Sequence, residues 1–179
     1  LLTPLLMIVV AGSFSVWAWT VEYLRRYRPG LNEVLMRMFG KMAHPHEAYR
    51  VNSATWYATA LLVLALLTDK LTASMGVIVL ALGDPMAAII GRRFGRIRLV
   101  AGRSLEGTLA FATAGTLGAL TTLVVFYPEL ALRDAASIAA SGAVAGALAE
   151  LFSRRVDDNF TIPLATALGV AAARFVLGV

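Results

Sequence analysis

The sequence predicts an all-α fold, a polytopic membrane bundle of about six transmembrane helices, and three observations support this prediction. The chain has 179 residues, 59% of them hydrophobic, and its mean hydropathy of +0.74 is too high for a soluble domain of this length. Apolar runs as long as a membrane span recur along the chain. Its Lys and Arg side chains gather in alternate connections between these runs, as they do in cytoplasmic loops.

The predicted spans are Leu1–Thr20, Ser53–Thr68, Leu71–Phe94, Leu105–Tyr127, Asp134–Phe152 and Phe160–Val179. We expect them to form one integral membrane domain over residues 1–179, because no linker, internal repeat or low-complexity tract divides the chain. The first residue is Leu and not Met, so we expect the natural start of the protein to be missing.

The basic residues predict the orientation of the spans. Of the 16 Lys and Arg residues, 13 lie between spans one and two, three and four, and five and six. The positive-inside rule places these three connections in the cytoplasm and both termini outside, most simply in a prokaryotic plasma membrane, with the endoplasmic reticulum as the alternative. The net charge of +5 therefore indicates topology and no nucleic-acid partner. The absence of cysteine excludes disulfides and thiolate chemistry.

The connection between spans one and two carries apolar residues at helical spacing over 31–39, which predicts an amphipathic helix on the membrane surface. Polar residues follow it: His44, His46, Glu47, Arg50 and Asn52. We consider Glu47, Arg50 and Asn52 as candidate substrate contacts, with a solvated charged turn as the alternative. The two histidines lack the third donor that a transition metal needs.

The third span carries an acidic residue at an unusual depth. Asp84 follows the apolar run 71–82, where an ionised side chain costs at least ~2.5–3.5 kcal/mol. Pro85 cannot donate a helical hydrogen bond, and Asp and Pro are both favoured at helix starts. We therefore predict that this helix breaks at Gly83-Asp84 and restarts at Pro85, leaving free N–H groups beside the carboxylate.

Five arginines follow this predicted break: Arg92, Arg93, Arg96, Arg98 and Arg103. Arginines at such positions are typical of topology anchors as well as of phosphate contacts, and we expect only one or two of them to touch substrate. Gly91 and Gly95 form a G-x-x-x-G pattern typical of close helix packing. Since Gly91 is seven residues from Asp84, the two share a helix face.

Further acidic residues begin or end the remaining spans. Glu106 lies where span four enters the bilayer, with Ser104 as its candidate N-cap, so we expect a partner or a metal for this carboxylate. Glu150 continues a face of small residues on span five and is expected to point into the bundle. Three polar residues precede span six: Asp157, Asp158 and Asn159. The predicted topology places them on the same membrane face as Asp84 and Glu106.

This combination of residues suits phosphoryl transfer. Carboxylate oxygens without cysteine favour a hard cation, so Mg²⁺ is expected, held by one or two carboxylates and by phosphate oxygens. Arginines and helix N-termini stabilise the charge that develops on a transferred phosphoryl group. A nucleotide would enter from the cytoplasm, whereas an apolar acceptor would enter from the bilayer.

Four motifs also carry a resemblance to a known family. They are, in order, H-E-x-x-R-V-N-S-A-T-W-Y, G-D-P-x-A-x-x-x-G-R-x-x-G, R-S-L-E-G-T and D-D-N-F-T-I-P-L. Together they resemble the CTP-dependent lipid kinase family of dolichol kinase, phytol kinase and CTP-dependent diacylglycerol kinase, over roughly His44 to the end of the chain. The resemblance implies transfer of the γ-phosphate of CTP to the hydroxyl of a membrane lipid alcohol: a polyprenol or dolichol, a phytol-like isoprenoid, or diacylglycerol.

The resemblance also implies residue roles. The catalytic and metal-binding carboxylates would be Asp84, Glu106 and Asp158, with Asp84 and Asp158 both eligible as general base. The nucleotide site would comprise Gly83, Gly91, Arg92, Gly95, Arg96, Arg103, Ser104, Gly107 and Asn159. Independently of the resemblance, the residues themselves suggest secondary substrate contacts at Glu47, Arg50, Asn52, Glu150 and Asp157. At Arg103 the family more often has Lys, so the charge is kept while a planar fork replaces a point donor.

Two alternatives stay open. CDP-diacylglycerol synthases are similar in the D-x-x-A-x-x-x-G-R-x-x-G stretch and in a K-x-x-E-G box, but they attack the α-phosphate of CTP and release pyrophosphate. Their long basic and His-Gly-Gly segment is absent here, which favours the kinase. A small anion transporter with a broken helix is the second alternative, although the chain has no detectable inverted second half. The sequence predicts no particular oligomeric state.

Overall fold

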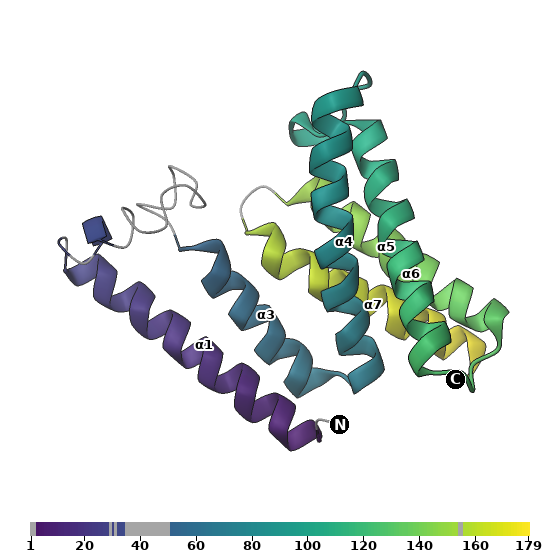
Figure 1. Ribbon diagram of the computed structural model, residues 1–179, viewed down its shortest axis with the longest axis horizontal. Coiled ribbons are helices and arrows are strands. Elements are labelled where there is room, and N and C mark those ends of the chain that lie inside the picture. Colours follow the sequence, from purple (N-terminus) through teal and green to yellow (C-terminus); the bar gives the residue numbers. More distant parts are fainter. Residues whose placement is uncertain (1–2, 29, 31, 35–50, 154–155) are drawn as a thin grey trace.

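The computed structural model describes residues 3–28, 30, 32–34, 51–153 and 156–179, and the labelled elements in this part of the chain are all helical (Figure 1). In order, these are α1 (Pro4–Tyr27), α3 (Ser53–Leu67), α4 (Lys70–Phe94), the 3₁₀ turn η2 (Val100–Gly102), α5 (Leu105–Phe126), α6 (Leu132–Phe152) and α7 (Asp158–Leu177). The predicted all-α fold is confirmed.

Five of these helices, α1, α4, α5, α6 and α7, are long and apolar enough to cross a membrane. The sixth, α3, is apolar but has 15 residues, about 22 Å at the helical rise, compared with a hydrocarbon core of about 30 Å. The predicted boundaries of this helix are nearly those observed. The polytopic helical bundle predicted from hydropathy is therefore confirmed, and α3 is its one helix shorter than a full span among the described residues.

Helices α4 and α5 run side by side in opposite directions, and α6 and α7 pack against them and against each other (Figure 1). The core between these four helices includes Met75 and Val79 of α4, Phe111 of α5, Ile138 of α6 and Ile162 of α7, none of them exposed. Helix α1 lies at the outer edge of the molecule, where it packs mainly on α3. The molecule thus has a tight four-helix part and a peripheral pair of helices.

The predicted break in the third span is wrong. Helix α4 runs without interruption from Lys70 to Phe94, with Pro85 inside it. Proline leaves the carbonyl of Ala81, four residues earlier, without its usual helical donor. Transmembrane helices tolerate this defect when local adjustments or neighbouring groups satisfy the carbonyl. Asp84 therefore projects from a continuous helix, and the helix N-termini closest to the polar region belong to α5 and α7.

Polar residues start α3, α5 and α7 at one end of the bundle. The side chain of Asn52 accepts from the Ala54 N–H, that of Ser104 from the Gly107 N–H, and that of Asp157 from the Asn159 N–H. The predicted cap Ser104 is confirmed. The last helix begins at Asp158, two residues before the predicted Phe160, because Asp157 already caps it. The polar ends of these helices consequently face one another, as the alternating topology requires.

Candidate functional site

Arg103 is the centre of the polar region at this end of the bundle. It follows Ala101 and Gly102, which adopt φ values of 60° and 78°, and this turn reverses the chain between α4 and α5. The turn directs the Arg103 guanidinium toward α6 and α7. Its Nη1 lies 2.9 Å from Oε1 of Glu150, and its Nη2 lies 3.2 Å from Oδ2 of Asp158. One cation thus joins carboxylates from two different helices.

Glu150 is only 2% exposed, and its two oxygens differ in their surroundings. Oε1 pairs with Arg103, whereas Oε2 is buried and has no hydrogen-bond partner within the described part of the chain. The Oγ1 atom of Thr108 on α5 is orphaned in the same way. Buried polar atoms without partners are costly and uncommon, so two of them together indicate a place for a hydrogen-bonding ligand.

Both orphaned residues line one polar cavity of about 280 Å³ between α4, the α4–α5 loop, α5 and α6. Its lining comprises Ala87, Ala88, Gly91, Arg92, Arg98, Gly102, Arg103, Ser104, Gly107, Thr108 and Glu150. Three arginines thus surround a space that also borders the N-terminus of α5. An anion is the ligand that such a charge distribution favours.

Asp84 lies on α4, about one helical turn before the cavity residues Ala87 and Ala88. It is half-buried, its charged neighbours are Asp158, Arg103 and Asp157, and it has no hydrogen-bond partner among the described residues. We name Asp84, Arg103, Glu150 and Asp158 the site cluster. Sequence analysis predicted Asp84, Arg103 and Asp158 as site residues and Glu150 as a secondary contact that points into the bundle, and the structure brings all four together.

Asp157 and Asn159 have clear structural contacts. Asp157 accepts from the Asn159 N–H at 3.0 Å and the Asn159 side-chain amide at 2.9 Å, while its other oxygen accepts from Ser53 Oγ at 2.8 Å. These bonds cap α7 and tie its start to the start of α3. They leave Asp158, whose carboxylate pairs with Arg103, as the acidic residue of the D-D-N motif that joins the site cluster.

The glycines at the site allow close packing. A Cβ on Gly91 or Gly107 would lie 3.1 Å from Ser104 Oγ, and one on Gly107 would also lie 3.2 Å from the Gly91 Cα. A Cβ on Gly95 would clash with the Gly91 carbonyl at 2.2 Å, and one on Gly83 with the Phe111 ring at 2.8 Å. These residues bring α4 and α5 together, and Gly91 and Gly107 also form part of the cavity wall.

Glu106 is separated from the site cluster. Its carboxylate accepts from the Ile97 N–H at 3.3 and 3.4 Å, and Arg96 is the cation beside it. Glu106 does not line the polar cavity, and no residue of the site cluster is among its contacts in the described part of the chain, so its predicted metal-binding role stays a prediction. Glu106 holds the exposed α4–α5 loop against the start of α5, and Arg96 belongs to this loop surface and not to the cavity lining.

Sequence analysis also predicted substrate contacts in the connection between α1 and α3. Glu47 and Arg50, with His44 and His46, lie outside the described residues, as does most of the predicted surface helix over 31–39. Asn52 is described, and its side chain caps α3 while its backbone N–H donates to Glu22 at 3.3 Å. Its observed contacts are therefore structural.

Sequence analysis missed Thr108 and a second charged group on α1. Glu22 is 3% exposed and forms ion pairs with Arg25 and Arg26 at 2.8 and 2.9 Å. We name these three residues the α1 cluster. Their spacing of three and four residues was the available signal, because such residues face each other on a helix. The α1 cluster lies in the last turns of α1, which continues to Tyr27, beyond the predicted end of the span at Thr20.

The described residues contain no group of three or more His, Cys, Asp or Glu side chains that could hold a metal ion by themselves. Magnesium does not require such a group, since one or two carboxylates and the oxygens of a bound phosphate suffice. Asp84 fits this demand because its oxygens have no hydrogen-bond partner in the described part of the chain, and Asp158 lies beside it. The donor set consists of oxygen ligands, which suits a hard cation.

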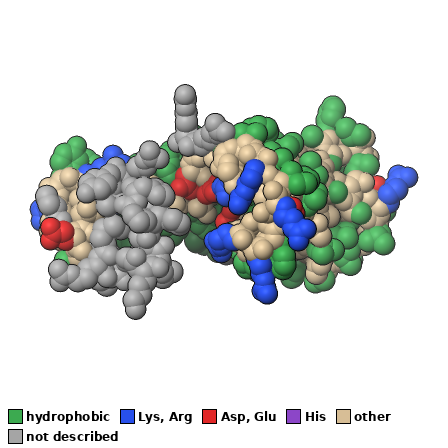
Figure 2. Space-filling model, turned by 90° about the horizontal axis from the view of Figure 1, so that it is seen from above, with side chains coloured by type: hydrophobic (Ala, Val, Ile, Leu, Met, Phe, Trp, Pro, Cys, Tyr) green, Lys and Arg blue, Asp and Glu red, His purple; other side chains and the backbone are tan. Residues whose placement is uncertain are grey.

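Figure 2 views the molecule from this polar end. Acidic side chains gather near the middle of the visible face, and Lys and Arg side chains stand around them over the α4–α5 side. This distribution agrees with the pairing of Arg103 with Glu150 and Asp158. The polar region is therefore accessible from the end of the bundle.

Comparisons with known proteins agree with the resemblance carried by the four motifs. No family model and no solved structure matches the chain. Phytol kinase from Synechocystis sp. is 31% identical over 166 residues, covering 89% of this chain and 65% of that protein. CTP-dependent diacylglycerol kinase 1 from Saccharomyces cerevisiae is 27% identical over 83% of this chain and 57% of its own length. A probable chloroplastic phytol kinase 2 from Glycine max is 27% identical over 89% of this chain and 61% of its own length.

The chain thus spans between 57% and 65% of the length of these three relatives, all of which are named as lipid kinases. The four ordered motifs and the curated relatives agree with each other. The chain is homologous to proteins named phytol kinase, CTP-dependent diacylglycerol kinase and farnesol kinase, which agrees with the lipid kinase resemblance of its four motifs.

Proposed function

We propose that this protein is a kinase that transfers the γ-phosphate of CTP to the hydroxyl of a lipid alcohol in the bilayer. The observation that carries the proposal is the site cluster, in which Arg103 pairs with Glu150 and Asp158 beside the unpaired carboxylate of Asp84. The names of the relatives support a kinase that acts on a lipid, and one of these names supports CTP as donor.

The polar cavity is the proposed place of the triphosphate. Arg92, Arg98 and Arg103 line it and would spread the charge of the phosphates, while the start of α5 contributes the positive end of its dipole. Arg103 has the further task of holding Glu150 and Asp158 in place. The orphaned Thr108 hydroxyl would donate to a phosphate oxygen, whereas Glu150 Oε2 would accept from a hydroxyl or amino group of the nucleoside.

Asp84 is the proposed position of the acceptor hydroxyl. The hydroxyl oxygen would form a bond to the γ-phosphorus while the bond between this phosphorus and the β–γ bridging oxygen breaks, releasing CDP. The hydroxyl proton would pass to a carboxylate, for which Asp84 and Asp158 are both eligible. A magnesium ion held by the other of these two carboxylates and by the phosphates would neutralise charge on the phosphate oxygens.

The orientation in the membrane completes the proposal. The site opens at the end of the bundle that carries the basic α4–α5 loop, and the positive-inside rule assigns this end to the cytoplasm, where CTP is found. The protein would then act in a prokaryotic plasma membrane, with the endoplasmic reticulum as the alternative.

The test uses the purified protein in detergent with CTP labelled at either the γ- or the α-phosphate. The acceptor panel comprises a polyprenol, dolichol, phytol and diacylglycerol. We expect γ-label in the lipid product and none of the α-label, and we expect EDTA to stop the reaction. Transfer of α-label with release of pyrophosphate would assign the protein to the CDP-lipid synthases instead. Absence of any labelled lipid would contradict an enzymatic role.

A further inference from the structure

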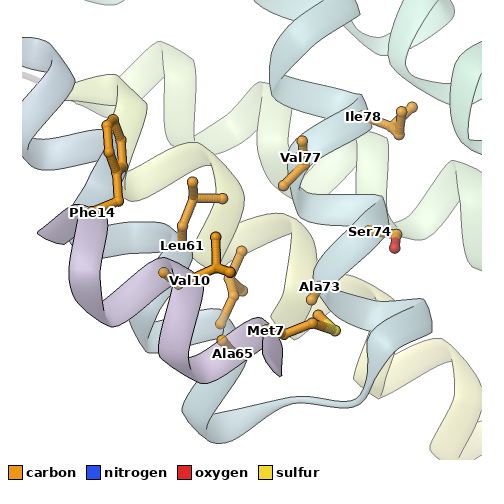
Figure 3. Close-up of a pocket in the computed structure, with 11 residues that line it drawn as sticks. Met7, Val10, Phe14, Leu61, Ala65, Ala73, Ser74, Val77 and Ile78 are labelled. Carbon is orange, nitrogen blue, oxygen red and sulfur yellow. The ribbon is translucent and has the colours of Figure 1, made fainter. Parts of the chain in front are cut away.

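A second cavity lies in the apolar part of the molecule, between α1, α3 and α4. It measures about 380 Å³ and is lined by Met7, Val10, Ala11, Phe14, Leu61, Leu64, Ala65, Ala73, Ser74, Val77 and Ile78. Ser74 is the one polar side chain in this lining. Figure 3 shows Val10 of α1 and Leu61 of α3 opposite Val77 of α4. We name this cavity the apolar groove.

The groove arises from the peripheral position of α1. This helix packs mainly on α3, and α3 has more contacts with α7 than with α4, so the α1–α3 pair leaves a space beside α4. Small residues such as Ala65 and Ala73 do not fill this space. Val10 and Phe14 are 56% and 40% exposed, so the groove is open along the side of a candidate membrane span, where lipid is the neighbour.

One face of α4 connects the groove with the site. With 3.6 residues per turn, Ala73, Val77, Asp84, Ala88 and Gly91 fall on a single stripe, since they are spaced by four, seven, four and three residues. The first two line the apolar groove, and the last two line the polar cavity. Asp84 stands between them, about 16 Å along the axis from Ala73 and about 10 Å from Gly91.

We propose that the apolar groove binds the hydrocarbon tail of the acceptor alcohol. The inference rests on the proposed function and deepens it by naming the substrate class. With the hydroxyl at Asp84, the tail follows the stripe toward Ala73 while the donor phosphate occupies the stripe toward Gly91. The two substrates thus approach Asp84 from opposite directions along one helix.

The size of the groove favours a single chain. Its 380 Å³ is near the lower end of the range of about 300–1,000 Å³ found for small-molecule sites. Diacylglycerol carries two hydrocarbon tails, whereas a prenyl or alkyl alcohol carries one. The proposed substrate class is therefore the single-chain alcohols, with an isoprenoid such as phytol as the tested representative.

The first experiment is photolabelling of the full chain in nanodiscs with a phytol analogue that carries a diazirine at the end of its tail. We expect the label on peptides of the groove, residues 7–14, 61–65 and 73–78, and we expect unlabelled phytol to displace it. A phospholipid analogue with a diazirine at the same depth serves as control for bulk lipid. Equal labelling of all lipid-facing helices, or displacement by diacylglycerol but not by phytol, would overturn the inference.

The second experiment compares two tryptophan variants. Val77→Trp fills the apolar groove at a stripe position seven residues before Asp84. Leu117→Trp adds a side chain of the same size on the exposed face of α5. Overpacking of this kind predicts about a five- to hundred-fold loss of displaceable labelling and of kcat/KM for phytol in Val77→Trp. Leu117→Trp should match the wild type. Wild-type labelling of the groove in Val77→Trp would contradict the proposal.

These measurements separate the inference from the proposed function. Displaceable labelling of the groove without transfer of phosphate from CTP would support the tail site and contradict the kinase. Transfer of phosphate to phytol with the label on α5 or α6 would support the kinase and contradict the tail site.

Discussion

The central glutamates of the α1 cluster and the site cluster are equally buried, yet they differ in how their oxygens are bonded. Glu22 is 3% exposed and Glu150 is 2% exposed. Both oxygens of Glu22 accept hydrogen bonds, from Arg25, Arg26 and the Asn52 N–H. Of the two oxygens of Glu150, Oε2 has no partner in the described part of the chain. Both clusters therefore contain a buried carboxylate, but only in the α1 cluster do both of its oxygens have hydrogen-bond partners among the described residues.

This difference indicates different roles. A buried carboxylate whose acceptor positions are filled stabilises a helix end and has little capacity left for a ligand. A buried carboxylate with a free oxygen, next to a cavity lined by arginines, retains that capacity. The α1 cluster joins α1 to the start of α3, whereas the site cluster is the one that we propose to bind substrate.

The largest effect is expected for Asp84→Asn. The amide has nearly the same shape but neither the charge nor the proton affinity of the carboxylate, so we expect activity to fall by about 10²–10⁴-fold. Because Asp84 has no hydrogen-bond partner among the described residues, thermal unfolding in detergent should change little. Wild-type turnover in this variant would remove Asp84 from the proposed site.

Arg103 offers a matched pair of variants. Arg103→Met removes the cation that joins Glu150 and Asp158, and we expect a loss of about 10²–10³-fold in kcat. Arg103→Lys keeps the charge but replaces the planar fork with a point donor, so it should recover only part of this loss. Steady-state kinetics with CTP as the varied substrate measure both. Equal activity of Arg103→Met and the wild type would contradict a role in phosphate binding.

Glu22→Gln should have the opposite profile. Breaking a buried ion pair typically costs about 3–5 kcal/mol, so this variant should unfold at a clearly lower temperature. The rate per folded molecule should stay at the wild-type value, because the α1 cluster is not part of the cavity lining. A specific loss of kcat in fully folded protein would show that the distinction between the two clusters is wrong.

The smallest effect is expected for Glu106→Gln. Its carboxylate lies at the loop surface and accepts from the Ile97 N–H, which a glutamine oxygen can also do. Activity should therefore remain within about ten-fold of the wild type, as for the loss of one ordinary hydrogen bond. The measurement is kcat/KM for CTP. Complete inactivation would restore Glu106 to the metal-binding role that its motif implies.

Much of the fold could be predicted because hydropathy alone determines which segments enter a bilayer. The predicted start of Ser53–Thr68 is the observed start of α3, and the predicted Leu105–Tyr127 differs from α5 by one residue. The continuity of α4 could not be predicted from Asp84 and Pro85 alone. Both residues are favoured at a helix start, and the packing of α4 against its neighbours overrides that local preference.

The site was predicted in part. Asp84, Arg103 and Asp158 were recognisable because charged residues in or beside apolar runs require partners. Which of these residues pair could not be predicted. Arg103 and Asp158 lie 55 positions apart in the sequence, and only the arrangement of α6 and α7 decides this contact. Thr108 is the last residue of the R-S-L-E-G-T motif, yet sequence analysis gave it no role of its own, because a threonine in a membrane helix ordinarily bonds to its own backbone. Glu106 was assigned by its motif, and the geometry of the loop places it elsewhere.

The most direct test of the central claim is the initial rate of γ-phosphate transfer from CTP to phytol, normalised to folded protein, in three samples: wild type, Asp84→Asn and Glu22→Gln. We predict a lipid phosphate in the wild type, the same rate in Glu22→Gln, and a loss of about 10²–10⁴-fold in Asp84→Asn. A wild-type rate in Asp84→Asn, or an equal loss in both variants, would contradict the assignment of chemistry to the site cluster and of stability to the α1 cluster.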